Sequence, residues 1–354
     1  MNKELYINGI GAISPQKTFD NSVFLEEVLS YSTNKMMCVD PDYSLFFDGR
    51  AIRRMSRILK FGIAAAMIAI DDAGKPELDA ISTGTGFGCL EDSEIFLRNI
   101  VAENEGVVSP TPFIQSTHNT VSGQIALLLK CQKANNTFSH KGFSFESALL
   151  DARLNALDYP TQQNFLVGSS DEVSTASYAI MSRMNIFRKE PCDNLSQLAS
   201  LGKGVIAGEG AAYVVLGKSA TENSYGRFVD VKMISNPKNE AAIEKAIHTF
   251  LAQHQLSVSD VDIVISGLCG DESRDALLKY CNENVYTEQS IVGFKHLCGE
   301  YMTASSFAVW LGAKMLKTQQ VPELVVLRNT ARTPKTILIH NAYKTNHSLI
   351  LLKQ

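Results

Sequence analysis

The sequence predicts an α/β protein in which helices cover layered sheets. Apolar runs of strand length alternate with longer helical runs along all 354 residues, a pattern typical of sheets packed between helices. The composition allows a large core, because 45% of the residues are hydrophobic and 20% are charged. The sequence contains no Pro- or Ser-rich linker, so two halves that share one core fit better than two tethered domains.

The elements of the first half follow from apolar patterning. Leu5–Ile10 has the length and composition of a strand, and Arg54–Ala73 is an Ala-rich helical stretch that ends at Gly74. The other expected elements are strands at Ala80–Thr83, Asn136–Phe138, Phe165–Val167 and Ala211–Leu216, and helices at Val121–Leu129 and Phe143–Leu157.

The second half repeats this alternation. We expect strands at Phe228–Ile234, Val261–Ser266, Leu324–Leu327, Thr336–Ile339 and Ser348–Leu352, and helices at Glu240–Gln253, Glu272–Tyr280 and Gly299–Leu316. Small and polar residues collect at Gly217–Gly226, which predicts halves at 1–217 and 218–354 within one globular unit.

Charge and cysteine usage exclude several classes of function. Thirty-three Lys and Arg against 37 Asp and Glu give a net charge of -4, which argues against broad nucleic-acid binding. No apolar run is long enough to span a membrane, and no signal-type segment starts the chain. The seven cysteines form no CxxC pair and predict reduced thiols in the cytoplasm, and no metal-ligand spacing is present.

Four motifs in a fixed order carry a family resemblance. They are Arg53–Arg57 before an Ala-rich helix, the Ser-Pro…Asn…Gly-Gln segment within Ser109–Ala126, Thr137–Gly142 on a strand-to-helix turn, and Gly208–Ala212 before a buried strand. In this order the chain resembles the β-ketoacyl-(acyl carrier protein) synthases over nearly its whole length. The resemblance implies a thiolase-like α-β-α-β-α fold built from two pseudo-symmetric halves.

Such synthases form a carbon–carbon bond by decarboxylative condensation. The resemblance implies a Cys nucleophile that holds the acyl chain, two His residues that act on the malonyl group, and no cofactor beyond the phosphopantetheine arm of acyl carrier protein. A thiolate suits the nucleophile because sulfur stays nucleophilic and leaves well.

This sequence departs from the family pattern at each catalytic position. Ser139 stands where the Cys is expected, and Gly267 and Glu300 stand at the two His positions. Lys295 of the second His motif remains, whereas the gating Phe of the C-terminal loop has become Ala342.

These changes argue against ordinary condensation. A Ser hydroxyl without a base is a poor nucleophile, a glycine donates no side-chain hydrogen bond, and an ionised Glu opposes a developing enolate. The pattern resembles the chain-length-factor subunits that pair with an active ketosynthase in type II polyketide systems, of the aryl-polyene or flexirubin kind. Two alternatives stay open: a Ser-dependent acyltransferase or atypical synthase, and a homodimeric protein that binds acyl chains or carrier without catalysis.

The resemblance also implies binding roles. The strand Lys133–Phe138 would pair across a dimer axis, and Phe87, Ala342 and Thr303 would contact the acyl chain. Arg53, Arg54 and Arg57 would dock acyl carrier protein.

Each of these residues has a simpler structural interpretation. Ser139 is also a typical helix N-cap, Phe87 could fill the core, and the arginines could be a solvated helix face. Glu300 could form an ion pair with Lys295, which could equally lie on the surface. Cys269 and Cys298, near the lost His positions, fit inert packing residues.

Overall fold

A computed structural model describes residues 4–199 and 202–354. Its strands are β1 Leu5–Ile13, β2 Ser32–Thr33, β3 Ala80–Gly84, β4 Ala134–Phe138, β5 Asn164–Asp171, β6 Cys192–Asp193, β7 Gly210–Gly217, β8 Gly226–Ile234, β9 Ile263–Ser266, β10 Ser290–Gly293, β11 Val326–Arg328, β12 Thr336–Tyr343 and β13 Asn346–Lys353. Eleven of them form one mixed sheet in the order β11-β10-β9-β12-β13-β8-β1-β7-β5-β3-β4, and β2 pairs with β6.

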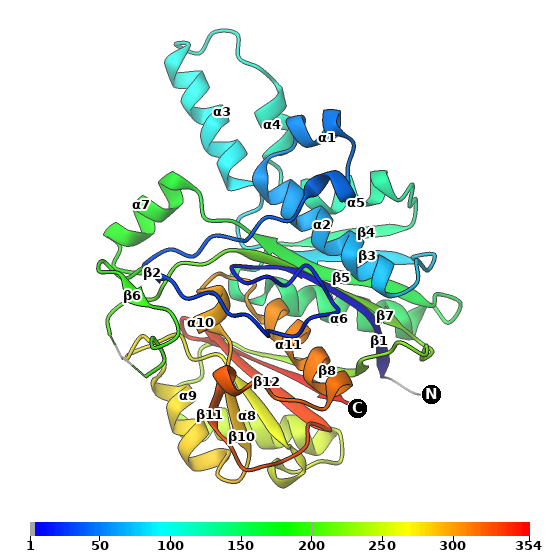
Figure 1. Cartoon of the computed structure of the whole chain (residues 1–354), viewed down its shortest axis with the longest axis vertical. Helices are drawn as coiled ribbons and strands as arrows, with labels where there is room; N and C mark the ends of the chain where they lie inside the picture. The colour runs from blue at the N-terminus through cyan, green and yellow to red at the C-terminus, as the bar shows by residue number, and fades with distance from the viewer. Residues whose placement is uncertain (1–3, 200–201) are drawn as a thin grey trace.

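The helices connect and cover these strands. They are α1 Gly49–Arg54, α2 Arg57–Asp72, α3 Leu90–Ala102, α4 Thr111–Gln115, α5 Thr120–Leu128, α6 Ser144–Asp158, α7 Thr175–Arg183, α8 Glu240–Gln253, α9 Ala276–Tyr280, α10 Lys295–Cys298 and α11 Ser305–Thr318. Figure 1 shows α6 and α11 between the two halves of the sheet, α2 and α5 on one outer side, and α8 and α9 on the other.

Strand alternation sorts the apolar side chains into these layers. In β7, Val214 and Leu216 join the central core around α6 and α11, whereas Tyr213 and Val215 face α2. In the second half, Ile263 of β9 joins the central core and its neighbour Val264 faces α8. Both halves of the sheet are therefore buried on two faces, and the expected α-β-α-β-α layering is confirmed.

The first helix of the outer layer lies very close to β1. A Cβ atom at Gly9 would lie 2.3 Å from the carbonyl oxygen of Ala69 in α2. Glycine is required here because α2 packs backbone to backbone against the strand. This contact fixes the position of α2, whose N-terminus leads toward the candidate site.

Several predicted elements differ from the structure. The helix expected over Arg54–Ala73 is interrupted, because Ser56 has extended backbone angles (φ -66°, ψ 169°) and separates α1 from α2. The helix expected over Gly299–Leu316 begins only at Ser305, since Gly299 has φ +71°. Helices α3, α4 and α7 and strand β10 lie in segments for which no element was predicted.

Candidate functional site

Lys295, which is retained from the family motif, and Glu300, which stands at a former His position, form a buried ion pair. The Nζ atom of Lys295 lies 2.8 Å from a carboxylate oxygen of Glu300, and the two side chains are 1% and 4% exposed. Lys295 also donates a hydrogen bond of 2.7 Å to the carbonyl oxygen of Ala342. The predicted ion pair is confirmed, and the alternative of Lys295 as a surface residue is wrong.

Burial and attraction act in opposite directions on this pair. Burial lowers the pKa of Lys295, but its interactions with Glu300, Cys269 and Asp275 together outweigh this effect and raise the pKa above its ordinary value. Burial raises the pKa of the Glu300 carboxyl, and Lys295 opposes that rise. The ammonium group is therefore a fixed positive charge, committed to Glu300 and to a backbone carbonyl.

Gly267 and Glu300, the two former His positions, face the same small pocket. This pocket is lined by Gly267, Cys269, Arg274, Asp275, Glu300, Ala342 and Lys344. The Cys269 thiol donates a hydrogen bond of 3.1 Å to Asp275, and burial raises the pKa of both Cys269 and Cys298. These thiols are protonated at neutral pH and do not replace the missing nucleophile.

Ser139 lies on an exposed turn, and within residues 4–199 and 202–354 no basic side chain forms a hydrogen bond with its hydroxyl. Its hydroxyl donates a hydrogen bond of 3.3 Å to the carbonyl oxygen of Gly86. The adjacent imidazole of His140 instead packs edge-on against Phe143, with ring centroids 5.5 Å apart. The N-cap interpretation of Ser139 is wrong, since the cap residue of the short 3-10 turn at Lys141–Phe143 is His140 and that of α6 is Phe143.

A narrow cavity lies on the other side of Glu300. It is lined by Phe87, Asp171, Glu172, Val173, Ser177, Met181, Ile186, Phe187, Gly208, Glu300, Tyr301, Met302 and Tyr343. Phe87 is 39% exposed, so the interpretation as a core residue is wrong. Ser139 does not line this cavity, but its partner Gly86 directly precedes Phe87 and contacts Met302.

The structure shows the surroundings of Thr303 and Ala342, two residues expected to contact the acyl chain. Thr303 is fully buried, and its hydroxyl donates a hydrogen bond of 2.8 Å to Asp171, so it supports the cavity wall, and its contact with the acyl chain stays a prediction. Ala342 lines the small pocket, whereas the ring of the next residue, Tyr343, lines the cavity. Tyr343 could have been found in the sequence as the aromatic residue directly after Ala342, which stands at the Phe position of the family.

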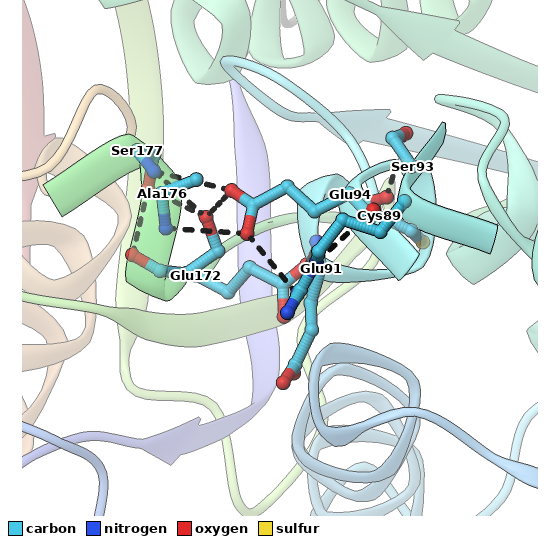
Figure 2. Close-up of polar contacts among 9 residues, drawn as sticks. Cys89, Glu91, Ser93, Glu94, Glu172, Ala176 and Ser177 are labelled. Carbon is cyan, nitrogen blue, oxygen red and sulfur yellow. Dashed lines mark hydrogen bonds and ion pairs between the residues drawn. The ribbon is translucent and has the colours of Figure 1, made fainter. Parts of the chain in front are cut away.

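Glu172, which the sequence analysis missed, connects the cavity to α3. One of its oxygens accepts a hydrogen bond of 3.0 Å from the backbone N–H of Glu91 in the first turn of α3 (Figure 2). In return, Glu94 of α3 accepts hydrogen bonds from the backbone N–H groups of Ala176 and Ser177 in the first turn of α7, at 3.2 and 3.1 Å. One first-turn amide of α3 and two of α7 are therefore satisfied by a carboxyl group from the other segment.

The three arginines predicted to dock acyl carrier protein differ in their surroundings. Arg53 and Arg54 are exposed at the end of α1. Arg57 forms an ion pair with the buried carboxylate of Glu209 and donates a hydrogen bond of 3.1 Å to the carbonyl oxygen of Cys38. This guanidinium therefore stabilises the turn before β7, and the docking of acyl carrier protein by these arginines stays a prediction.

Strand β4 is one of the two edge strands of the large sheet. It pairs with β3 on one side, and its first three residues are exposed. Helices α5 and α6 contact β4 and carry exposed leucines on either side of it, Leu127 at 69% and Leu154 at 46%. An unpaired edge between apolar side chains is a surface suited to a protein partner.

Comparison with known proteins identifies the family. The family model of the β-ketoacyl synthase N-terminal domain matches residues 11–222. The chain belongs to the β-ketoacyl synthase family. No curated protein matches the sequence.

Solved structures of this synthase family share the fold. The ishigamide ketosynthase/chain length factor has a TM-score of 0.82 at 16% identity, with 100% of each chain covered. A β-ketoacyl synthase from Burkholderia phymatum has a TM-score of 0.81 at 16% identity over 100% of each chain. The complex of a ketosynthase with its chain length factor from Xenorhabdus doucetiae gives 0.76 at 14% identity, covering 99% of this chain and 98% of that one.

The structure offers neither a metal-binding cluster nor a membrane-spanning helix within the described residues. Within residues 4–199 and 202–354, no group of three or more His, Cys, Asp and Glu side chains could hold a metal ion. In the same part of this synthase-family chain, no helix has the length and apolar character needed to span a bilayer.

Proposed function

We propose that this chain is a condensation-inactive subunit of the chain-length-factor type, which pairs with an active ketosynthase and forms part of its acyl-binding cavity. The observation that supports this most is the buried Lys295–Glu300 ion pair beside Gly267. In the family, imidazoles at the positions of Gly267 and Glu300 act on the malonyl group. Here one imidazole is absent and the other is replaced by a carboxyl whose partner is already in place.

The second support is the exposed Ser139. Its hydroxyl is directed at the Gly86 carbonyl, and the neighbouring imidazole faces Phe143. A hydroxyl in this environment keeps its proton, because no base accepts it. The acyl chain would therefore be held as a thioester on the partner and delivered by the phosphopantetheine arm of acyl carrier protein.

The partner would bind at the edge of β4. The strand offers unpaired backbone groups, and the exposed leucines of α5 and α6 offer apolar area on both sides. Helices α3 and α4 project from the body of the molecule (Figure 1) and expose Leu97, Val101, Phe113 and Ile114. Structures of a ketosynthase with its chain length factor share this fold, which makes a ketosynthase the partner we favour.

The test is reconstitution with a Cys-bearing ketosynthase of the same source. We expect condensation of acyl- and malonyl-carrier protein only when both chains are present, and co-elution of the two in size-exclusion chromatography. Leu154→Glu should abolish co-elution and activity together. Leu327→Glu is the matched control, since Leu327 is also exposed but lies on β11 at the opposite edge of the sheet.

Two outcomes would refute the proposal. Robust turnover by the isolated chain that is lost in Ser139→Ala would identify a Ser-dependent enzyme. A stable homodimer that ignores the ketosynthase and binds carrier would identify the non-catalytic binding protein.

A further inference from the structure

Helices α3 and α4 project from the body of the molecule and bury few of their side chains (Figure 1). Among the 13 residues of α3, Asp92 alone is buried, and α4 has no buried residue. Within residues 4–199 and 202–354, no side chain of residues 90–115 belongs to an apolar core. Apolar burial therefore does not fix these two helices, and their polar contacts with the body decide where they lie.

The carboxyl group of Glu94 is the main polar contact between α3 and the body. It accepts hydrogen bonds from the backbone N–H groups of Ala176 and Ser177 in the first turn of α7, at 3.2 and 3.1 Å (Figure 2). It also accepts a hydrogen bond from the hydroxyl of Ser174, which directly precedes α7. The Glu94 side chain is 13% exposed, so water competes little for these three donors.

The charge of Glu94 suits the helix end that it contacts. The first turn of α7 carries free amides and the positive end of the helix dipole, and a carboxylate is stabilised there. The N-cap residue Ser174 accepts a hydrogen bond of 3.2 Å from the Ser177 N–H, which is thus shared between Ser174 and Glu94. Arg98 lies 4.0 Å from Glu94 but is 70% exposed, so it adds little to this contact.

The position of α3 also sets the position of α4. The rings of Phe96 in α3 and Phe113 in α4 lie with their centroids 5.1 Å apart and hold the two helices together. At the end of α4, the side-chain amide of Gln115 donates a hydrogen bond of 2.7 Å to the carbonyl oxygen of Arg54. This last contact involves one neutral donor, so the contact of Glu94 with three donors is the stronger of the two.

The two helices present apolar side chains to the solvent. Leu97 and Val101 of α3 are 61% and 77% exposed, and Phe113 and Ile114 of α4 are 56% and 66% exposed. The chain passes from α4 directly to α5, whose exposed Leu127 lies beside the edge strand β4. This apolar surface therefore continues the one that we assign to the ketosynthase partner. A surface that is held in place before binding loses less conformational entropy when the partner docks.

We propose that the contact of Glu94 with the first turn of α7 holds helices α3 and α4 in the position in which their apolar side chains meet the ketosynthase partner. Glu94 is thus a positioning residue for subunit pairing, which acts through the two helices that it anchors. This inference rests on the proposed function, because it names a residue on which the same pairing depends.

The test measures the affinity of the complete chain for its ketosynthase by isothermal titration calorimetry. We expect Glu94→Ala to raise the dissociation constant at least about 10-fold, because the free helices must be ordered when the partner binds. The melting temperature of the isolated chain should stay nearly unchanged, since Glu94 lies outside the apolar cores. Trypsin should cleave the isolated variant faster after Arg98, which lies in α3 and is exposed.

Two further variants separate positioning from folding and from net charge. Glu94→Gln keeps one acceptor oxygen but turns an NH₂ group toward the α7 amides, so its dissociation constant should lie between those of the unmodified chain and Glu94→Ala. Glu103→Ala is the matched control, because it removes an exposed carboxyl group at the end of the same helix and should change neither the affinity nor the cleavage rate. A residue needed only for folding would lower the melting temperature and leave the affinity of the folded chain unchanged.

The two proposals fail in different ways. Equal dissociation constants for the unmodified chain and Glu94→Ala, or an equal loss of affinity in Glu103→Ala, overturn the role of Glu94 and leave the proposed function standing. If Glu94→Ala does not fold, the same comparison is made with Glu94→Gln, and an unchanged affinity overturns the role of Glu94. Failure of the unmodified chain to bind the ketosynthase overturns the proposed function itself.

Discussion

Removing the positive charge of the buried ion pair should be one of the most damaging single changes outside the apolar core. In Lys295→Met, the Glu300 carboxylate loses its partner at 2.8 Å while 4% of its side chain is exposed. Breaking a buried pair by removing one partner costs about 3–5 kcal/mol, because the remaining charge is neither paired nor solvated. The hydrogen bond to the Ala342 carbonyl is lost as well.

The loss should depend on pH in a defined direction. Burial already raises the pKa of Glu300 in the presence of Lys295, and without that attraction the pKa rises further. A group whose pKa is higher in the folded state contributes stability below its unfolded pKa and loses it as the pH rises through the folded value. The destabilisation of Lys295→Met should therefore be small near about pH 5 and largest near about pH 8.

Urea denaturation followed by circular dichroism measures this effect at both pH values. The double variant Lys295→Met/Glu300→Gln removes both charges, so we expect it to recover much of the lost free energy of unfolding. A loss below about 1 kcal/mol at the higher pH, as for an exposed pair, or an equal loss at both pH values, would refute the reasoning.

Three further results are expected. Ser139→Ala should leave the activity of the reconstituted pair within about twofold, as measured by carrier-bound product, since the hydroxyl has no base; a hundredfold loss would assign it a catalytic role. Arg57→Met should lower the free energy of unfolding by about 2 kcal/mol, because it leaves the Glu209 carboxylate without its cation. Arg53 is exposed, so Arg53→Met should change the free energy of unfolding by less than about 0.5 kcal/mol in the same urea titration. Leu154→Glu should leave the melting temperature of the isolated chain nearly unchanged while it prevents association, and a large drop in melting temperature would show that the side chain packs within the subunit.

Local signals in the sequence predicted much of the fold. The helix Glu240–Gln253 has the predicted bounds because Asn239 caps it, with its side chain accepting a hydrogen bond of 3.0 Å from the Ala242 N–H. The late start of α11 was not predictable in the same way. It depends on the close approach of Gly299 to Gly208, which is distant in the sequence.

In the candidate site, too, local contacts were predictable from the sequence and contacts between distant residues were not. The Lys295–Glu300 pair was predictable, because a buried carboxyl needs a cation and a lysine lies five residues before it. The partner of Arg57 was not, since Glu209 is 152 residues away and only the packing of α2 against the turn before β7 joins them. The hydrogen bond of Thr303 to Asp171 was also not predictable, because Asp171 lies at the end of β5, 132 residues away.

The exchange of carboxyl groups between α3 and α7 has a consequence for motion. Glu94 lies in α3 and accepts two amides at the start of α7, so α3 cannot unravel past Glu94 without exposing amides of α7. Glu172, just before α7, accepts an amide at the start of α3 and adds a second connection between the two segments. The two segments should open as one cooperative unit, with matching hydrogen–deuterium exchange rates at the Glu91 and Ser177 amides. A change that loosens the projecting helices α3 and α4 would then also open the segment around Glu172, which lines the cavity.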